Sequence, residues 1–246
     1  LPLILKPDGH GKLSKRDGDR LGFPTFAMDW TDPNTKEQTI GFKERGFLPE
    51  AFVNLLAMLG WNDGTDKEIF DINELVANFS LERVHKGGAK FDYEKAKWFN
   101  QEWIKRTDDE TLSLLVKPYL DAVNIIVHEH SYLVKVIGLV KERCHLLPDF
   151  VTQSAFFFGT PSTIDTASIA SKWDAKKHSF FDELVKVYTN QIDAGNITLP
   201  ALELESAFKA LAAKHELKPG ELMLPFRIML VGGKFGPGVL DRKSVV

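Results

Sequence analysis

The chain has 246 residues, of which 43% are hydrophobic and 26% charged, with a formal net charge of −3. This length allows one or two domains with a sizeable core, and the mild negative charge excludes a protein that coats nucleic acid through a large basic surface. The single cysteine, Cys144, excludes a disulfide within the chain, and no apolar run reaches the eighteen or so residues of a membrane span. We therefore expect a cytoplasmic protein with no membrane partner.

Strand-forming segments are short and lie before residue 45. Residues 3–5, 26–28 and 39–42 have the length and residue types of short strands. Three cations occur in five residues between the first two, at Lys12-Leu13-Ser14-Lys15-Arg16, and glycines on both sides predict a mobile loop. Such a loop fits a polyphosphate, although the Walker A spacing is absent because Lys6 and Leu13 occupy its diagnostic positions. A solvated basic turn is the alternative.

A helix is predicted over 48–59, where apolar residues recur at helical spacing between Pro49 and Gly60. Residues 81–106 then carry seven cations against four anions. This excess of positive charge could contact an RNA backbone. Pairing on the helix surface, such as Glu94 with Lys97 and Glu102 with Arg106, explains the same residues equally well.

The remainder of the chain is predicted to be helical. Thr107, with Glu110 three residues later, is a candidate N-cap and marks a boundary. Apolar stripes predict helices over 121–141, 181–192 and 202–215, with a turn-rich break at 159–163. The fold class is mainly α: a small mixed α/β module over 1–106, then helical subdomains over 107–175 and 176–246.

Several ordered blocks resemble bacterial glutamyl-tRNA synthetases, which are class I aminoacyl-tRNA synthetases. The five-residue loop is similar to their K-M-S-K-S signature, and further blocks agree in sequence and spacing. These blocks are Leu3-Ile4-Leu5-Lys6-Pro7-Asp8-Gly9, Phe47-Leu48-Pro49-Glu50-Ala51, Leu59-Gly60-Trp61, Ser80-Leu81-Glu82-Arg83, Ala89-Lys90-Phe91-Asp92, Trp98-Phe99-Asn100 and Leu222-Met223-Leu224-Pro225-Phe226-Arg227. The family's Rossmann-type catalytic domain, with its H-I-G-H signature, has no counterpart in the sequence. The resemblance thus implies a C-terminal fragment, truncated or replaced after Gly238.

The resemblance assigns Lys15 to catalysis, within an ATP-binding loop of Lys12, Leu13, Ser14, Lys15 and Arg16. A mobile cation that reaches the α-phosphate and the departing pyrophosphate mainly in the transition state lowers the barrier to glutamyl-adenylate formation. Lys12 and Arg16 are expected to shape the loop or to face the tRNA, and Ser14 is expected to cap or hydrogen-bond the turn. No recognisable triad context supports a serine nucleophile.

The resemblance also implies two contact regions for tRNA. Residues 41–106 resemble the stem-contact region, with Arg83, Lys86, Lys90 and Lys95 as candidates, and the helical remainder resembles the anticodon-binding cage. Arg143 aligns with an arginine that reads the third anticodon letter, and Arg227 is a second candidate. Each has a structural alternative, because Arg143 could close a helix against its dipole and Arg227 could simply pack.

Other motifs support no site. His128-x-His130 lacks a third ligand at metal spacing, so no metal site is predicted. The glycine-rich stretch 232–238 follows a helix-like segment, so it does not fit a dinucleotide fingerprint.

The full-length enzyme is expected to use ATP with magnesium and L-glutamate through its missing domain, whereas the fragment alone is expected to be an inactive monomer that binds glutamate tRNA. A free-standing helical RNA-binding module and a non-catalytic protein scaffold remain open as alternatives.

Overall fold

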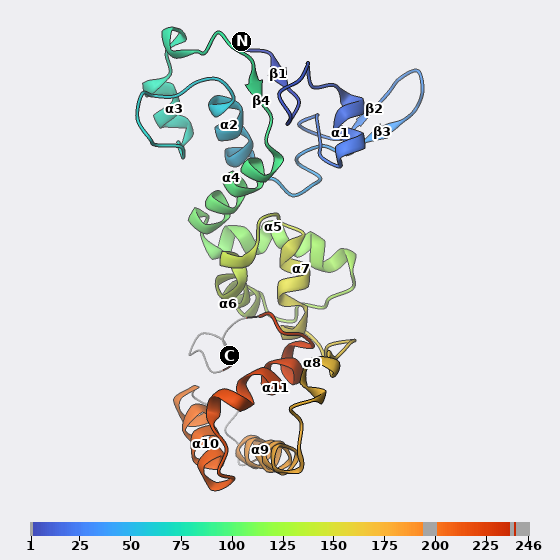
Figure 1. Cartoon of the computed structure of the whole chain (residues 1–246), viewed down its shortest axis with the longest axis vertical. Helices are drawn as coiled ribbons and strands as arrows, with labels where there is room; N and C mark the ends of the chain where they lie inside the picture. The colour runs from blue at the N-terminus through green and yellow to red at the C-terminus, as the bar shows by residue number, and fades with distance from the viewer. Residues whose placement is uncertain (1, 194–200, 237–238, 240–246) are drawn as a thin grey trace. The chain divides into compact units, whose positions relative to one another are not determined.

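The computed structural model describes residues 2–193, 201–236 and 239. The chain divides into two compact units, the first formed by Leu1–Tyr119 with Lys141–Thr152 and the second by Leu120–Val140 with Gln153–Val246. Helices dominate both units, which confirms the mainly α prediction (Figure 1). The predicted boundaries after residues 106 and 175 stay predictions.

Four two-residue strands and most of the shorter helices belong to the first unit. β1 pairs with β4 in parallel, and β2 pairs with β3 in antiparallel fashion. The elements are β1 (Ile4–Leu5), α1 (Lys15–Leu21), β2 (Trp30–Thr31), β3 (Gln38–Thr39), α2 (Pro49–Met58), α3 (Ile72–Asn78), the 3-10 turn η1 (Leu81–Arg83), β4 (Ala89–Lys90), α4 (Tyr93–Arg106) and the 3-10 turn η2 (Lys141–Arg143).

Every regular element among the described residues of the second unit is a helix. Its elements are α6 (His130–Val140), η3 (Ala155–Phe157), α8 (Ala167–Ala170), α9 (Ala175–Asp193), α10 (Ala201–Lys214) and α11 (Pro219–Val231). α5 (Asp109–Ala122) and α7 (Asp149–Ser154) each cross from one unit to the other along the chain.

An aromatic core fixes the first unit. α2 packs against α4, and buried rings from the segments around them meet in one cluster that includes Phe42, Phe47, Phe91 and Phe99. Phe42 and Phe47 contact edge to face at 4.9 Å. Ile4 and Leu13 pack on this cluster, so the core holds both sides of the turn that precedes the basic segment.

Two buried asparagines tie loops to the helices of this core. The Asn100 side chain accepts the Leu48 amide at 2.7 Å and donates to the His145 carbonyl at 2.6 Å. Asn54 accepts the amide of Phe70 at 3.0 Å and the indole N–H of Trp103 at 3.2 Å. Neither role was evident in the sequence, because a single asparagine on an apolar helix has no periodic signal.

The second unit has its own aromatic core between α9, α10 and α11, which lie together in Figure 1. Phe180 and Phe208 meet edge to face at 5.2 Å, and Phe208 stacks on Phe226 at 5.5 Å. The predicted helices over 181–192 and 202–215 correspond to α9 and α10. The predicted change of the chain end after Gly238 falls almost wholly outside the described residues.

Several local predictions about strands and caps are wrong. Residues 26–28 form no strand, whereas β4, after residue 45, pairs with β1. A two-residue strand is decided by its partner, and here Gly88 lies so close to Leu5 that a Cβ would approach its Cδ1 to 2.7 Å. The cap at the start of α5 falls on Asp108, which accepts the Thr111 amide at 2.8 Å, while Thr107 ends α4.

The single helix predicted over 121–141 is two elements. α5 ends at Ala122, and α6 begins at His130. Asn124 has a φ of +60°, and the Ile125 amide donates to the Leu120 carbonyl at 3.0 Å. Asparagine tolerates the left-handed conformation that ends a helix, so the apolar stripe continues in sequence although the helix does not.

Candidate nucleic-acid interface

The basic segment begins on a turn and continues into a helix. Gly9 and Gly11 each have a φ of +82°. The Leu13 amide donates a hydrogen bond to the Ile4 carbonyl at 2.9 Å, which closes the turn. Ser14 then caps α1, so the prediction of a loop is wrong for Lys15 and Arg16, which form the first helical turn. The expectation that Ser14 caps or hydrogen-bonds the turn is confirmed. Its capping box with Asp17 holds the lysine at a helix start.

Asp17 balances part of the positive charge around this helix. Its carboxylate accepts the Ser14 hydroxyl at 2.6 Å and pairs with Lys6 at 3.1 Å and Arg20 at 3.3 Å. The donated hydroxyl, followed by the ammonium of Lys6, holds the pKa of Asp17 below its ordinary value. Asp17 therefore stays ionised at neutral pH and fixes the cap.

Lys15 is held by the β2–β3 hairpin. Its ammonium lies 3.2 Å from a Glu37 carboxylate oxygen and 4.9 Å from the centroid of the Trp30 ring. The side chain is 23% exposed. The sequence predicts neither partner, because Trp30 and Glu37 lie 15 and 22 positions from Lys15 along the chain. A ligand that takes this ammonium must compete with one carboxylate and one cation–π contact.

Beside this site, Lys12, Arg16 and Lys90 carry positive charge that pairs with no described acidic residue. Leu5 is in register with Lys90 in β4 and with Lys12 across the turn, which places the two lysines on one face, about 10 Å apart at the backbone. Gly9 lies against the stem of Lys90, since a Cβ there would be 2.5 Å from its Cε. Lys12 and Arg16 are exposed and form no ion pair with any residue that the structure describes.

The other predicted stem-contact residues do not join this cluster by any described contact. The Arg83 guanidinium donates to the Asp63 carbonyl, and Lys86 is exposed in the bend before β4. Lys95 pairs with Glu68 at 2.6 Å and lies 4.1 Å over the Trp98 ring. Glu94 pairs with Lys97 as expected at 2.7 Å, but Glu102 pairs with Lys105 at 2.8 Å and not with Arg106.

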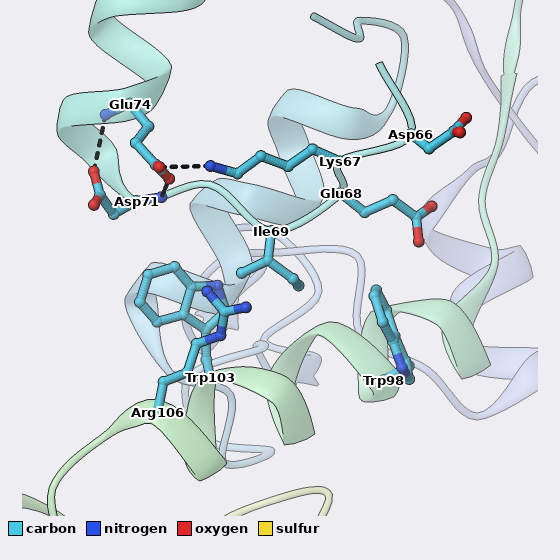
Figure 2. Close-up of a pocket in the computed structure, with 9 residues that line it drawn as sticks. All are labelled: Asp66, Lys67, Glu68, Ile69, Asp71, Glu74, Trp98, Trp103 and Arg106. Carbon is cyan, nitrogen blue, oxygen red and sulfur yellow. Dashed lines mark hydrogen bonds and ion pairs between the residues drawn. The ribbon is translucent and has the colours of Figure 1, made fainter.

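A cleft of about 560 Å³ opens between α4 and the segment that leads into α3 (Figure 2). Trp98, Trp103 and Arg106 project into it from α4, and Lys67 pairs with Glu74 across its other side. Acids outnumber bases in its lining, which is completed by Asp66, Glu68, Ile69 and Asp71. The charge is opposite to the one that RNA phosphates require.

Arg143 lies on η2, a turn anchored to the helices of the first unit. Lys141 pairs with Asp109 at 2.8 Å, and Gln101 donates to the Glu142 carbonyl at 3.0 Å. Arg143 itself is exposed. The next residue, Cys144, is buried, and burial raises the pKa of its thiol to about 12, so the thiol stays protonated and unreactive. The fixed turn presents the guanidinium on a rigid base.

Arg227 lies on α11 in the second unit and is partly buried. Its Nη1 donates to the Lys234 carbonyl at 3.5 Å, and its Nε has no hydrogen-bond partner among the described residues. A buried donor without a partner is costly. Arg227 therefore stays a candidate contact with RNA, and packing of its side chain stays the alternative.

Two features are absent from the part of the chain that the structure describes. No three or more His, Cys, Asp or Glu side chains gather as metal ligands would, and no helix is long and apolar enough to cross a membrane.

The sequence model of the anticodon binding domain family matches residues 111–244. This is more than half of the chain, and the chain belongs to that family. The match includes Arg143 and Arg227.

More specific similarity extends over the whole chain. It is 43% identical over 242 residues to a glutamate–tRNA ligase of Flavobacterium psychrophilum, and 42% identical over 247 residues to that of Flavobacterium johnsoniae. The alignments cover 98% and 100% of this chain, but 46% and 47% of the relatives. The chain thus spans about half the length of the curated relatives it matches.

Solved structures agree with this similarity. The crystal structure of a glutamate tRNA ligase from Elizabethkingia meningosepticum, in complex with its amino acid, superposes with a TM-score of 0.87 at 39% identity. That match covers 98% of this chain and 47% of the other. A second structure, from Elizabethkingia anophelis, gives a TM-score of 0.81 at the same identity. The predicted resemblance to this family is confirmed.

Proposed function

We propose that the chain is the tRNA-recognising part of a cytoplasmic glutamate–tRNA ligase. The observation that carries the proposal is the anticodon binding domain match over 111–244, together with similarity to glutamate–tRNA ligases along the entire chain. The whole ligase would join glutamate to ATP and pass the acyl group to its tRNA. By itself, this chain would act as a monomer that grips RNA.

Lys15 would be the chain's contribution to the chemistry of the whole enzyme. Its ammonium would leave Glu37 and meet the negative charge that develops on the α-phosphate and the departing pyrophosphate of a magnesium-bound ATP. Lys12, Leu13, Ser14 and Arg16 would complete the loop, with Leu13 and the Ser14 cap fixing its base. Loss of one such contact typically costs about 3 kcal/mol of transition-state stabilisation.

The RNA contacts would come from exposed cations on both units. Lys90 and Lys86 are exposed, whereas Arg83 and Lys95 already have partners, so we expect the first two to contribute more to stem binding. Arg143 and Arg227 would read the anticodon loop, where unpaired bases present their edges to a guanidinium.

A titration of the whole chain against glutamate tRNA and glutamine tRNA tests this function. We expect tighter binding of glutamate tRNA, and we expect Arg143→Ala to reduce that preference by roughly tenfold, which corresponds to about 1.4 kcal/mol. Arg143→Lys keeps the positive charge but loses the planar guanidinium with its paired donors, so it should also reduce the preference for glutamate tRNA. The control is Arg45→Ala, which removes an exposed arginine of the first unit.

The alternatives predict different outcomes of the same titration. A general RNA-binding module would bind both tRNAs equally, and a protein scaffold would bind neither. Either result would contradict the proposal.

A further inference from the structure

A cavity of about 600 Å³ lies within the second unit, where the N-terminal ends of α9 and α11 meet. Trp173, Lys172 and Asp174 line one side, and Glu221, Leu224 and Pro225 line the other. Leu224 and Pro225 belong to one of the blocks that carry the family resemblance, whereas no sequence motif points to Trp173, Lys172, Asp174 or Glu221. The volume is large enough for a nucleotide, and the lining combines a flat ring with charged groups.

Trp173 is fixed as a stacking surface. Its indole lies parallel to the Phe181 ring, with centroids 5.7 Å apart and planes 11° from each other. Phe181 belongs to the buried core of this unit, so one face of the indole is held by the core. The ring remains partly exposed and lines the cavity, so a planar ligand in the cavity can contact it.

The charges in the cavity are not all used internally. Asp174 caps α9 by accepting the Lys177 amide at 2.8 Å, and its carboxylate also pairs with the Lys177 ammonium. By contrast, Lys172 and Glu221 are exposed, and neither side chain forms an ion pair within the described ranges. The cavity thus offers one cation and one carboxylate to a ligand.

Pro225 makes the backbone carbonyl of Glu221 a possible hydrogen-bond acceptor for a ligand. It lies inside α11 and has no amide hydrogen, so it cannot donate to the Glu221 carbonyl four residues earlier. Both residues line the cavity. A backbone carbonyl that lacks its helical partner needs another donor.

We propose that this cavity binds one unpaired nucleobase of the tRNA anticodon loop, a base that bears an exocyclic amino group. The base would stack on Trp173, its amino group would donate to the Glu221 carboxylate or carbonyl, and a flanking phosphate would contact Lys172. This inference rests on the proposed function, because it assigns a further contact to the same RNA.

The test measures binding of the whole chain to glutamate tRNA in which one loop nucleotide at a time is abasic. We expect Trp173→Leu to weaken binding of intact tRNA about tenfold, in the range for loss of one stacked base. One abasic position should weaken the unmodified chain by a similar factor. The two losses should not add, since they remove the same contact.

Charge variants give an independent readout. Lys172→Ala should weaken binding about fivefold. The matched control, Lys176→Ala, removes an exposed lysine of α9 that pairs with Glu216 and does not line the cavity, so it should change binding less than twofold. If circular dichroism shows that Trp173→Leu does not fold, Lys172→Ala and the abasic series decide whether the cavity binds a nucleobase.

The outcomes separate this inference from the proposed function. If the unmodified chain binds glutamate tRNA while Trp173→Leu and Lys172→Ala bind it equally well, the cavity serves another ligand and only this inference fails. Full additivity of Trp173→Leu with every abasic position also overturns it. If the unmodified chain binds no tRNA, both fail.

Discussion

At the residue scale, cations with internal partners lie beside cations without them. Lys6 and Arg20 share Asp17, and Lys15 is held by Glu37, whereas Lys12 and Arg16 have no acidic partner in the described parts of the chain. A paired surface charge contributes little to a new partner until its own pair breaks. Unpaired cations are therefore the stronger candidates for RNA contacts.

This difference predicts an effect on salt dependence. The binding constant falls as salt rises, so the slope of log K against log salt is negative. Removing a cation that contacts a phosphate makes this slope less steep by roughly 0.7 to 0.9. Lys12→Ala and Arg16→Ala should each do so in tRNA binding measured across a salt series. Lys97→Ala, whose ammonium pairs with Glu94, is the control and should leave the slope unchanged. Equal slopes for all three variants would contradict the assignment.

The lowered pKa of Asp17 predicts that the stability of the first unit depends on pH. Its pKa in the folded chain lies below the ordinary 3.8, so its contribution to stability is complete above about pH 4 and is lost as the pH falls through the folded value. Asp17→Asn should lower the urea midpoint of the first unit at pH 7 and make it less sensitive to acid. Asp19→Asn, two residues away and exposed, should keep the acid sensitivity of the unmodified chain.

At the element scale, the sequence predicts the helices that have a regular spacing of apolar residues. It does not predict structure that depends on contacts between residues far apart in the chain. α2, α9 and α10 follow from apolar stripes, and Pro49 marks the start of α2. The pairing of β4 with β1 and the hold on Lys15 depend on residues far apart in sequence. The basic residues of the candidate interface were predictable from the family resemblance, but their partners were not.

Gly46 makes one such contact between distant segments, because it lies close against Leu147 and Pro148. Its φ is +89°, and a Cβ would lie 2.3 Å from Pro148 Cδ and 2.9 Å from the Leu147 amide nitrogen. Gly46→Ala should therefore lower the free energy of unfolding by about 3 kcal/mol, through left-handed strain and overpacking together. Gly22→Ala, with a φ of +79° and open space around it, should cost about 1 kcal/mol. Equal losses in urea unfolding would show that the close approach has no energetic weight.

At the scale of the whole molecule, the chain matches the half of its relatives that carries the anticodon binding domain. We propose that recognition of RNA and formation of the adenylate are divided along the polypeptide. In this proposal Lys15 would serve the reaction, and the helices that follow it would bind the RNA. The predicted domain boundaries after residues 106 and 175 remain to be tested by expressing the segments separately.

This division predicts that the chain alone does not activate glutamate. With glutamate, ATP and magnesium, exchange of labelled pyrophosphate into ATP should stay at background with or without tRNA. Exchange above background that is abolished by Lys15→Ala would contradict the prediction, because it would place the complete site within these residues.

A hydroxyl-radical footprint of glutamate tRNA bound by the whole chain shows whether the chain recognises the anticodon. We predict protection of the anticodon loop and of the inner stem, with loop protection reduced in Arg143→Ala and Arg227→Ala. A footprint confined to the stem, or no footprint at saturating protein, would contradict the account.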